Sequence, residues 1–171
     1  MPFRNIGGLD NEQRAIALVN LLRQHGLTIA TAESLTGGLV SAVIVDVPRA
    51  SEVLRGAVVA YSNDVKREVL GVDGDLLAER GAINAATAGQ MAVGVRKLMR
   101  ADVGIATTGV AGPDPADGSP PGTAIVACSW AKEEPAIRVL RLQGNRAEVR
   151  TQVVTRALEL AEATIRQTSG I

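Results

Sequence analysis

The sequence predicts an α/β fold, a three-layer α/β/α sandwich with a mixed, mainly parallel sheet. Short apolar segments alternate along the chain with longer segments of helical periodicity, which is the pattern of a sheet covered by helices on both faces. Near the end, two apolar segments are separated by only a short polar stretch, which adds an antiparallel hairpin. The 171 residues, 46% of them hydrophobic, suit one domain over residues 1–171.

The first elements surround a pair of glycines. Apolar residues at helical spacing, closed by Gly26, predict a helix over residues 11–25. A short strand over residues 27–32 runs into Ser34, and the apolar segment 39–47 predicts a second helix, which the following proline ends. A strand, a glycine turn and a helix therefore follow one another directly.

The middle of the chain predicts one strand and three helices. Residues 55–61 form a compact apolar run that is typical of a buried strand. Residues 62–64 (SND) supply helix N-cap chemistry for a short helix that ends at Gly71. Further helices are expected at 75–80 and 85–100.

The last third predicts three strands, a loop and a helix. Residues 109–122 contain four glycines and four prolines, too many for regular structure. The strands are expected at 102–108, 122–130 and 136–142, and the final helix at 145–167. The strand ends near Ser34, Tyr61 and Gly109 are then expected to meet at one edge of the sheet, where open α/β domains bind ligands.

Composition excludes several classes of function. Eighteen Lys and Arg balance eighteen Asp and Glu, so no overall field attracts nucleic acid or a membrane, and Phe3, Tyr61 and Trp130 are too few aromatics for a base-stacking surface. One Cys and one His provide no disulfide and no metal-ligand set, so we expect neither metal nor cofactor. The sequence has neither the apolar core of a signal peptide nor a membrane span, so we expect a cytoplasmic protein. Val- and Leu-rich surfaces are compatible with a homodimer, although no pattern specifies one.

The segment TAESLTGG, residues 31–38, carries the best indication of chemistry. Ser34 lies at the transition from strand to helix, and the amides of Gly37 and Gly38 are suited to bind an oxyanion or a phosphate. The alternative is that Ser34 and Thr36 only cap the following helix. The local pattern does not decide between the two.

A serine nucleophile needs a base, and the sequence leaves lysine as the candidate. His25 is the only histidine and falls at the end of the first helix. Lys66 follows the cap at 62–64, where the positive end of a helix dipole and burial both disfavour the charged amine. The alternative is a solvated lysine beside Arg67.

Three further features are candidates for the site. Tyr61 ends the apolar strand, so its phenol either orients the lysine or relays a proton, or its ring covers the core. The loop over residues 109–122 either presents amides to a substrate or is a plain surface loop. Arg146, before the last helix, is suited to a phosphate.

Several segments together resemble one family, the carboxy-terminal domain of the competence/damage-inducible protein CinA, which includes the nicotinamide-nucleotide amidases (PncC). The segments are TAESLTGG (31–38), GAVVAYSNDVKREVLGV (56–72), ATAGQMAVGVR (86–96), ADVGIATTGVAGPDP (101–115) and GNR (144–146). The resemblance implies metal-free hydrolysis of the carboxamide of nicotinamide mononucleotide to nicotinate mononucleotide and ammonia. It also implies the stand-alone form, because the large amino-terminal domain of many members has no counterpart here.

The resemblance also implies roles for individual residues. Ser34 corresponds to the nucleophile, Lys66 to the general base and Tyr61 to a proton relay or lysine positioner. The surface that binds the oxyanion and the phosphate corresponds to Thr36, Gly37, Gly38, Thr108, Gly109, Ala111 and Gly112, with Arg146 as a further ligand contact. The family loop commonly runs GPxGGTxxKPVGT, whereas this chain has GPDPADGSPPGT, which leaves substrate contacts from residues 114–121 open.

Two other functions remain open at this point. One is a non-catalytic module that binds a nucleotide or a partner and is connected with competence or DNA damage. The other is an amidase for a related amide, since the altered loop is a place where specificity changes.

Overall fold

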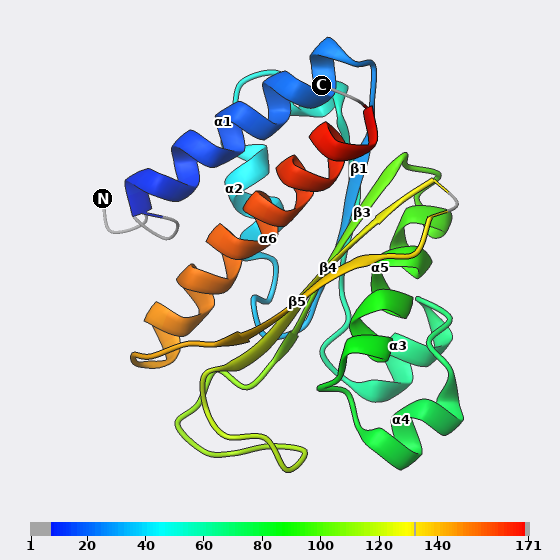
Figure 1. The fold of residues 1–171 in the computed structure, drawn as a ribbon, viewed down its shortest axis with the longest axis vertical. Helices are drawn as coiled ribbons and strands as arrows, with labels where there is room; N and C mark the ends of the chain where they lie inside the picture. The colour runs from blue at the N-terminus through cyan, green and yellow to red at the C-terminus, as the bar shows by residue number, and fades with distance from the viewer. Residues whose placement is uncertain (1–7, 132, 170–171) are drawn as a thin grey trace.

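A computed structural model describes residues 8–131 and 133–169, and its centre is one open sheet (Figure 1). The strand order is β2-β1-β3-β4-β5, from β1 (Ile29–Glu33), β2 (Leu54–Val59), β3 (Val103–Gly109), β4 (Thr123–Trp130) and β5 (Ala136–Arg141). β1 pairs in parallel with β2 and β3, whereas β4 is antiparallel to β3 and to β5. All strands except β4 therefore run in one direction, which confirms the predicted mixed, mainly parallel sheet.

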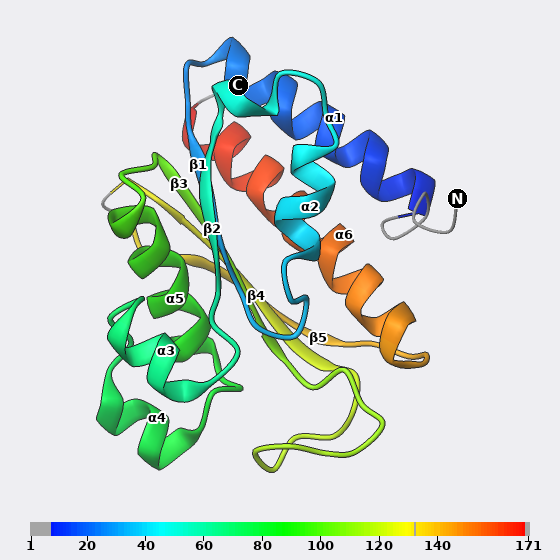
Figure 2. The ribbon, with the colours of Figure 1, turned by 180° about the vertical axis from the view of Figure 1, so that it is seen from behind.

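Helices cover both faces of the sheet and complete the predicted three layers (Figures 1 and 2). One face carries α1 (Gly8–Gln24), α2 (Leu39–Val45) and α6 (Arg146–Ser169). The other face carries α3 (Asn63–Glu68), α4 (Gly74–Arg80) and α5 (Ala85–Leu98). A short 3-10 helix, η1 (Ala50–Glu52), leads into β2. None of the helices in the described ranges is both long and apolar enough to cross a membrane.

The buried side chains form two apolar layers, one on each face of the sheet. Val103, Ile105 and Val126 face the layer under α1, α2 and α6, whereas Ala106 and Ala127 face the layer under α5. The α5 face of the sheet is thus built from small residues, which lets the helix approach the strands closely. As the composition predicts, Ala, Val, Leu and Ile dominate the core of the described chain.

The prediction of a strand at residues 55–61 is confirmed, but the prediction that this strand is buried is wrong. β2 is an edge strand, and its residues alternate between half-buried and exposed, with Val59 48% exposed. A short apolar run does not distinguish a central strand from an edge strand, because position in the sheet is set by pairing with distant segments. The predicted hairpin of β4 and β5 is confirmed, although Lys132, in its connection, lies outside the described residues.

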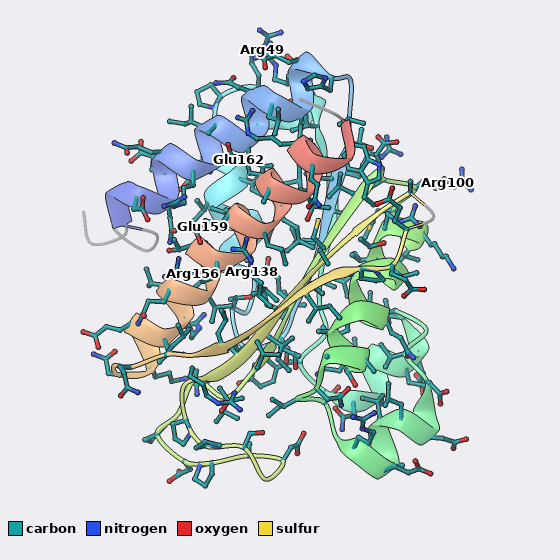
Figure 3. The ribbon with its side chains drawn as sticks, in the orientation of Figure 1. Arg49, Arg100, Arg138, Arg156, Glu159 and Glu162 are labelled. Carbon is teal, nitrogen blue, oxygen red and sulfur yellow. The ribbon has the colours of Figure 1, made fainter. Side chains whose placement is uncertain are left out.

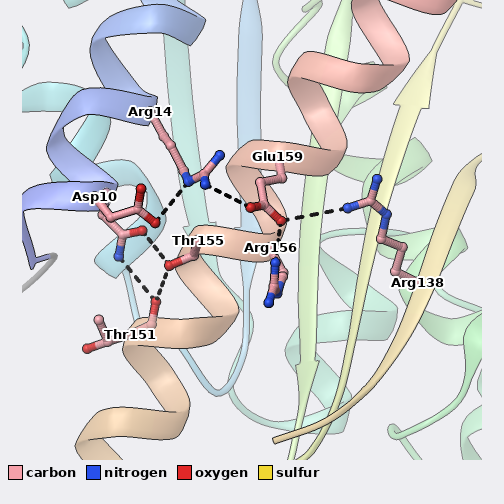
Figure 4. A network of polar contacts seen from close by, with 8 residues as sticks. Asp10, Arg14, Arg138, Thr151, Thr155, Arg156 and Glu159 are labelled. Atoms are coloured by element: carbon pink, nitrogen blue, oxygen red, sulfur yellow. Dashed lines mark hydrogen bonds and ion pairs between the residues drawn. The ribbon is translucent and has the colours of Figure 1, made fainter.

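A polar network ties α1, α6 and β5 together (Figure 4). Glu159 accepts ion pairs from Arg14 (3.0 Å), Arg156 (2.8 Å) and Arg138 (3.8 Å), one from each of the three elements. Beside it, the buried Asn11 donates to the Thr151 carbonyl over 3.2 Å. Figure 3 shows this cluster along α6, whereas Arg49 and Arg100 lie at the end of the molecule away from the 109–122 loop. The network fixes the outer helices and is separate from the candidate site.

Two glycines of α5 give a matched test of how closely this helix packs against its neighbours. A Cβ on Gly94 would lie 2.0 Å from the Leu70 carbonyl oxygen, whereas one on Gly89 would make ordinary contacts of 3.5 Å and longer with Ile137 and Pro135. Alanine normally favours a helix over glycine by about 1 kcal/mol. We therefore expect Gly89→Ala to keep or raise the free energy of unfolding and Gly94→Ala to lower it by roughly 1–3 kcal/mol in denaturant titrations. Equal effects of the two substitutions would contradict the close contact.

Candidate active site

Ser34 follows β1 directly, at the carboxyl end of a strand that lies between β2 and β3. Its amide continues the ladder by donating to the Thr107 carbonyl over 3.0 Å, and the Ala60 amide donates to the Glu33 carbonyl on the other side over 2.9 Å. The backbone that leads into Ser34 is therefore hydrogen-bonded on both sides, to β3 and to the residue that follows β2. The predicted gathering of strand ends near Ser34, Tyr61 and Gly109 is confirmed by the parallel pairing.

The carboxylate of Glu33 organises the turn after Ser34. Glu33 is fully buried and accepts five hydrogen bonds, from the hydroxyls of Thr31 (3.2 Å) and Thr36 (2.7 Å) and from the amides of Gly38 (3.0 Å), Val40 (3.0 Å) and Ser41 (2.8 Å). Three of these donors are backbone N–H groups at the start of α2, which would otherwise lack partners. The helix is thus capped by a glutamate from the preceding strand, a role that sequence reasoning missed.

The predicted anion-holding role of the Gly37 and Gly38 amides is wrong. The Gly37 amide donates to the Ser34 carbonyl over 3.0 Å, and the Gly38 amide donates to Glu33. The Thr36 hydroxyl is also used by Glu33, and none of these three residues lines the cavity described below. Both glycines have positive φ, of 61° and 97°, so their function in the structure is to form the turn. The alternative that Ser34 and Thr36 cap the helix is also wrong, since neither side chain bonds to its first amides.

Arg150, from α6, clamps the same turn from outside. Its Nε donates to the Leu35 carbonyl and its Nη2 to the Thr36 carbonyl, both over 2.9 Å. With both carbonyls fixed, the peptide planes between Leu35 and Gly37 are fixed as well. This role was not predictable, because an arginine 116 positions from Ser34 looks like any solvated helix residue in the sequence.

Lys66 lies beside Ser34 and is the largest fully buried side chain, only 1% exposed. Its Nζ is 3.4 Å from Ser34 Oγ and 3.1 Å from the carbonyl oxygen of Tyr61. Burial lowers the pKa of the Lys66 amine, and the carboxylate of Asp117 opposes this effect. Of the two sequence interpretations, the solvated lysine beside Arg67 is excluded.

The proposed contribution of a helix dipole to Lys66 is not supported by its position. α3 has only six residues, and Lys66 lies in its last turn rather than at its positive end. Ser62 occupies the N-cap position, but its hydroxyl donates to Asp64 and accepts no hydrogen bond from a helix amide. Desolvation is therefore the cause of the lowered pKa.

Tyr61 contacts Lys66 through its backbone and not through its phenol. The phenol is directed to Arg146, whose Nη2 donates to the Tyr61 hydroxyl over 3.1 Å while its Nη1 donates to the Gly112 carbonyl over 2.8 Å. Tyr61 is 62% exposed, so the alternative that its ring covers the core is wrong. The phenol bridges the end of β2 to α6, whereas the lysine is held by a main-chain carbonyl.

The loop after β3 closes the other side of the site. Gly109 must be glycine, because a Cβ there would lie 2.4 Å from the Thr123 carbonyl oxygen. The Thr108 hydroxyl donates to the Ala82 carbonyl over 2.9 Å, and the Ala82 amide donates to Asp117 over 3.0 Å. The connection between α4 and α5 is thus joined both to the end of β3 and to the loop.

These elements enclose a cavity of about 610 Å³. Eight of the predicted site residues line it: Ser34, Tyr61, Lys66, Thr108, Gly109, Ala111, Gly112 and Arg146. Leu35 lines it together with Ala111 and Gly112, and the amides of these three residues donate to no other residue of the described chain. The cavity thus contains a hydroxyl beside a buried amine, together with unpaired amide donors.

Other parts of the molecule offer less chemistry. A larger hollow of about 710 Å³ lies on the outer side of α5, but none of the described residues that line it carries a hydroxyl or a thiol. Cys128 is buried in β4, and burial raises the pKa of its thiol to about 12, so it stays protonated. His25 is exposed just after α1. The cavity at Ser34 is therefore the candidate active site.

Glu33 provides a direct test of how the site is held. In Glu33→Gln the side chain keeps one acceptor oxygen and turns an NH₂ group toward amide donors, so several buried N–H groups lose their partner. We expect the free energy of unfolding to fall by about 2–4 kcal/mol. Glu79→Gln, at an exposed position of α4, serves as the control and should leave stability unchanged in the same denaturant titrations. A similar stability for both variants would show that the carboxylate does not organise the turn.

Known proteins resemble this chain along nearly its whole length. A family model described as the CinA C-terminal domain matches residues 11–165. A CinA-like protein of Frankia casuarinae is 44% identical over 154 residues, which are 90% of this chain and 35% of that protein, so the chain spans about a third of that relative.

Among solved structures, a competence-damaged protein (CinA) superfamily protein from Klebsiella pneumoniae has a TM-score of 0.88 at 28% identity and covers 92% of this chain and 98% of its own. The competence/damage inducible protein CihA from Agrobacterium tumefaciens has a TM-score of 0.87 at 33% identity and covers 92% and 96%. The sheet, the layers and the match over residues 11–165 show that the chain belongs to the CinA C-terminal domain family.

Proposed function

We propose that the protein is an amidohydrolase that converts nicotinamide mononucleotide to nicotinate mononucleotide and ammonia, with Ser34 as nucleophile and Lys66 as general base. The observation that carries this proposal is the buried Lys66 amine 3.4 Å from the Ser34 hydroxyl in a 610 Å³ cavity. A buried lysine is expensive to keep charged, and a neutral amine beside a hydroxyl is a base for it. The substrate comes from the family resemblance and not from the geometry.

The reaction needs one proton acceptor that later becomes a donor. Ser34 Oγ attacks the carboxamide carbon while Lys66 Nζ takes the hydroxyl proton, and the carbonyl π electrons move to the oxygen. The resulting ammonium of Lys66 then protonates the amide nitrogen, which leaves as ammonia and forms an ester on Ser34. Water, deprotonated by Lys66, attacks that ester. The Lys66 ammonium then returns the proton to Ser34 Oγ as the ester C–O bond breaks, which restores the hydroxyl and the neutral amine, and the acid product gives its own proton to solvent and leaves as the carboxylate.

The oxyanion of the tetrahedral intermediate needs hydrogen-bond donors inside the cavity. The unpaired amides of Leu35, Ala111 and Gly112 are suited to this role, and they replace those of Gly37 and Gly38. Leu35 follows the nucleophile directly, and Arg150 fixes its peptide group through the carbonyl. Arg146 keeps further N–H groups beyond its two hydrogen bonds, which support a role in holding the phosphate.

Lys66 is held by two acceptors and has no carboxylate in direct contact among the described residues. The Tyr61 carbonyl directs the amine toward Ser34 and is present whatever side chain stands at position 61. This arrangement supports a role for Tyr61 as a lysine positioner through its main chain.

The mechanism predicts the behaviour of two variants. With nicotinamide mononucleotide as substrate, we expect Lys66→Met to lower the rate of ammonia release by at least about a hundredfold and Ser34→Ala by at least about a thousandfold. Both variants should remain folded, because each replaces a buried polar group by an apolar one of similar or smaller size. Ser51→Ala and Lys97→Met, at exposed positions, are the matched controls and should keep full activity.

The same assay separates the competing functions. Unchanged turnover in both site variants would refute the Ser34 and Lys66 mechanism. Binding of the mononucleotide without ammonia release at any pH would favour the non-catalytic module, and faster hydrolysis of nicotinamide or its riboside than of the mononucleotide would favour an amidase for a related amide.

Tyr61→Phe separates the contribution of the Tyr61 phenol from that of its backbone carbonyl. The substitution keeps the carbonyl that holds Lys66 but removes the acceptor for Arg146. We expect KM for the mononucleotide to rise by about 2- to 10-fold, the equivalent of one hydrogen bond, because Arg146 is less well placed, while kcat changes little. A large fall in kcat at unchanged KM would instead identify the phenol as a proton relay.

A further inference from the structure

The divergent part of the loop is an ordered hairpin. The Ala116 amide donates to the Ser119 carbonyl over 3.1 Å, and the Ser119 amide donates to the Ala116 carbonyl over 2.8 Å. The two residues between them, Asp117 and Gly118, both have positive φ, of 46° and 69°. This is the two-residue turn that the dipeptide Asp-Gly favours. The residues that depart from the family loop therefore have a defined structure of their own.

The hairpin turns Asp117 toward the wall of the cavity. Asp117 Oδ2 accepts the Ala82 amide over 3.0 Å, and a Cβ added at Gly81 would lie 2.9 Å from that same oxygen. The absence of a side chain at Gly81 is what leaves room for the carboxylate. Asp117 and Lys66 both line the 610 Å³ cavity, so the carboxylate is held in place across the same space as the amine.

Few other charges face the Lys66 amine. Of the loop residues, Asp114 and Asp117 line the cavity, and α6 contributes only Arg146, which is bonded to Tyr61 and Gly112. The connection between α4 and α5 contributes Ala82 and Ile83, which carry no charge. On β1, the carboxylate of Glu33 is directed to the start of α2.

The neighbours of Lys66 on its own helix are occupied elsewhere. Asp64 accepts from the Ser62 hydroxyl, and Arg67 pairs with Glu68 over 2.9 Å at the surface. Asp117 is the charged group that raises the pKa of Lys66 against the effect of burial. The ammonium form of the base thus has one identifiable counter-charge, and it lies on the divergent hairpin.

We propose that Asp117 is a positioning residue that docks the 109–122 loop on the Ala82 amide and supplies the negative charge facing Lys66, so that the base can hold a proton between its two transfers. This inference rests on the proposed role of Lys66 as base. A buried amine without a counter-charge accepts the Ser34 proton less readily. A carboxylate in direct contact would hold the proton too tightly to release it to ammonia. With a carboxylate across the cavity, the strength with which the amine holds its proton lies between these two extremes.

The charge state of Lys66 can be measured without any substrate. The chain has only three lysines, Lys66, Lys97 and Lys132, so protein labelled with ¹³C at lysine Cε gives three resonances, and Lys66→Met assigns the one of interest. We expect the titration midpoint of the Lys66 resonance to move to lower pH in Asp117→Asn, because the raising influence is lost while the amide oxygen still accepts from Ala82. Asp114→Asn makes the same change in the same loop and should leave the midpoint where it is in the unsubstituted protein.

The pH profile of hydrolysis is the second measurement. Since Lys66 must be neutral to act as base, kcat/KM rises with pH through the pKa of Lys66, and we expect this acidic limb to move to lower pH in Asp117→Asn. Asp117→Ala, which also loses the bond to Ala82, should shift the NMR midpoint in the same direction and in addition raise KM.

An unchanged Lys66 midpoint in Asp117→Asn, or an equal shift in Asp114→Asn, would overturn the inference. The NMR titration reports on Lys66 whether or not the protein hydrolyses an amide. A shifted midpoint without hydrolysis would therefore refute the proposed function and leave the contact of Asp117 with the site intact.

Discussion

The buried carboxylate of Glu33 is the interaction on which the site depends. A charged group removed from water costs several kcal/mol unless it is fully hydrogen-bonded, and here five donors from the same short segment supply the bonds. The chain can bury this glutamate only by turning sharply at Gly37 and Gly38 and starting α2 at once. That turn leaves Ser34 at the end of β1, with its hydroxyl facing the cavity and its backbone bonded to β3. The hydrogen bonds of Glu33 therefore determine where Ser34, the proposed nucleophile, lies.

Lys66, beside the next residue Ser34, has the opposite electrostatic surroundings. Glu33 has a donor for every lone pair, whereas the Lys66 amine has two neutral acceptors and a carboxylate only across the cavity. Burial disfavours the charged form of the Lys66 amine. Two equally buried side chains thus have different surroundings, since Glu33 is fully hydrogen-bonded whereas Lys66, the proposed base, is not. Arg150 clamps the turn from α6, and the Tyr61 carbonyl holds Lys66.

Much of the fold was predictable from the sequence because local patterns determine it. Periodicity and the prolines and glycines between segments predicted the three layers, the hairpin of β4 and β5 and most element boundaries. The edge position of β2 was not predictable, because it depends on which strands pair. In the site, the glycine pair correctly indicated a turn but not the direction of its amides, since Glu33 takes the donor of Gly38. Arg150 and Asp117 were missed because each contacts backbone that only the folded chain brings near. Glu33 was missed because its partners, although close in the sequence, are amides whose direction the sequence does not show.

The loop after β3 separates main-chain groups that line the cavity from the charged side chains that follow them. The amides of Ala111 and Gly112 lie in the part that matches the family pattern, and they do not depend on the side chains that follow. The divergent residues 114–121 form a hairpin whose Asp-Gly turn needs only two positive φ angles and a docking point on Ala82. This segment brings two carboxylates, those of Asp114 and Asp117, to the wall of the cavity. The main-chain amides at residues 111–112 and the charged side chains of the hairpin thus occupy separate parts of one loop, so the side chains can differ while the main-chain groups stay the same.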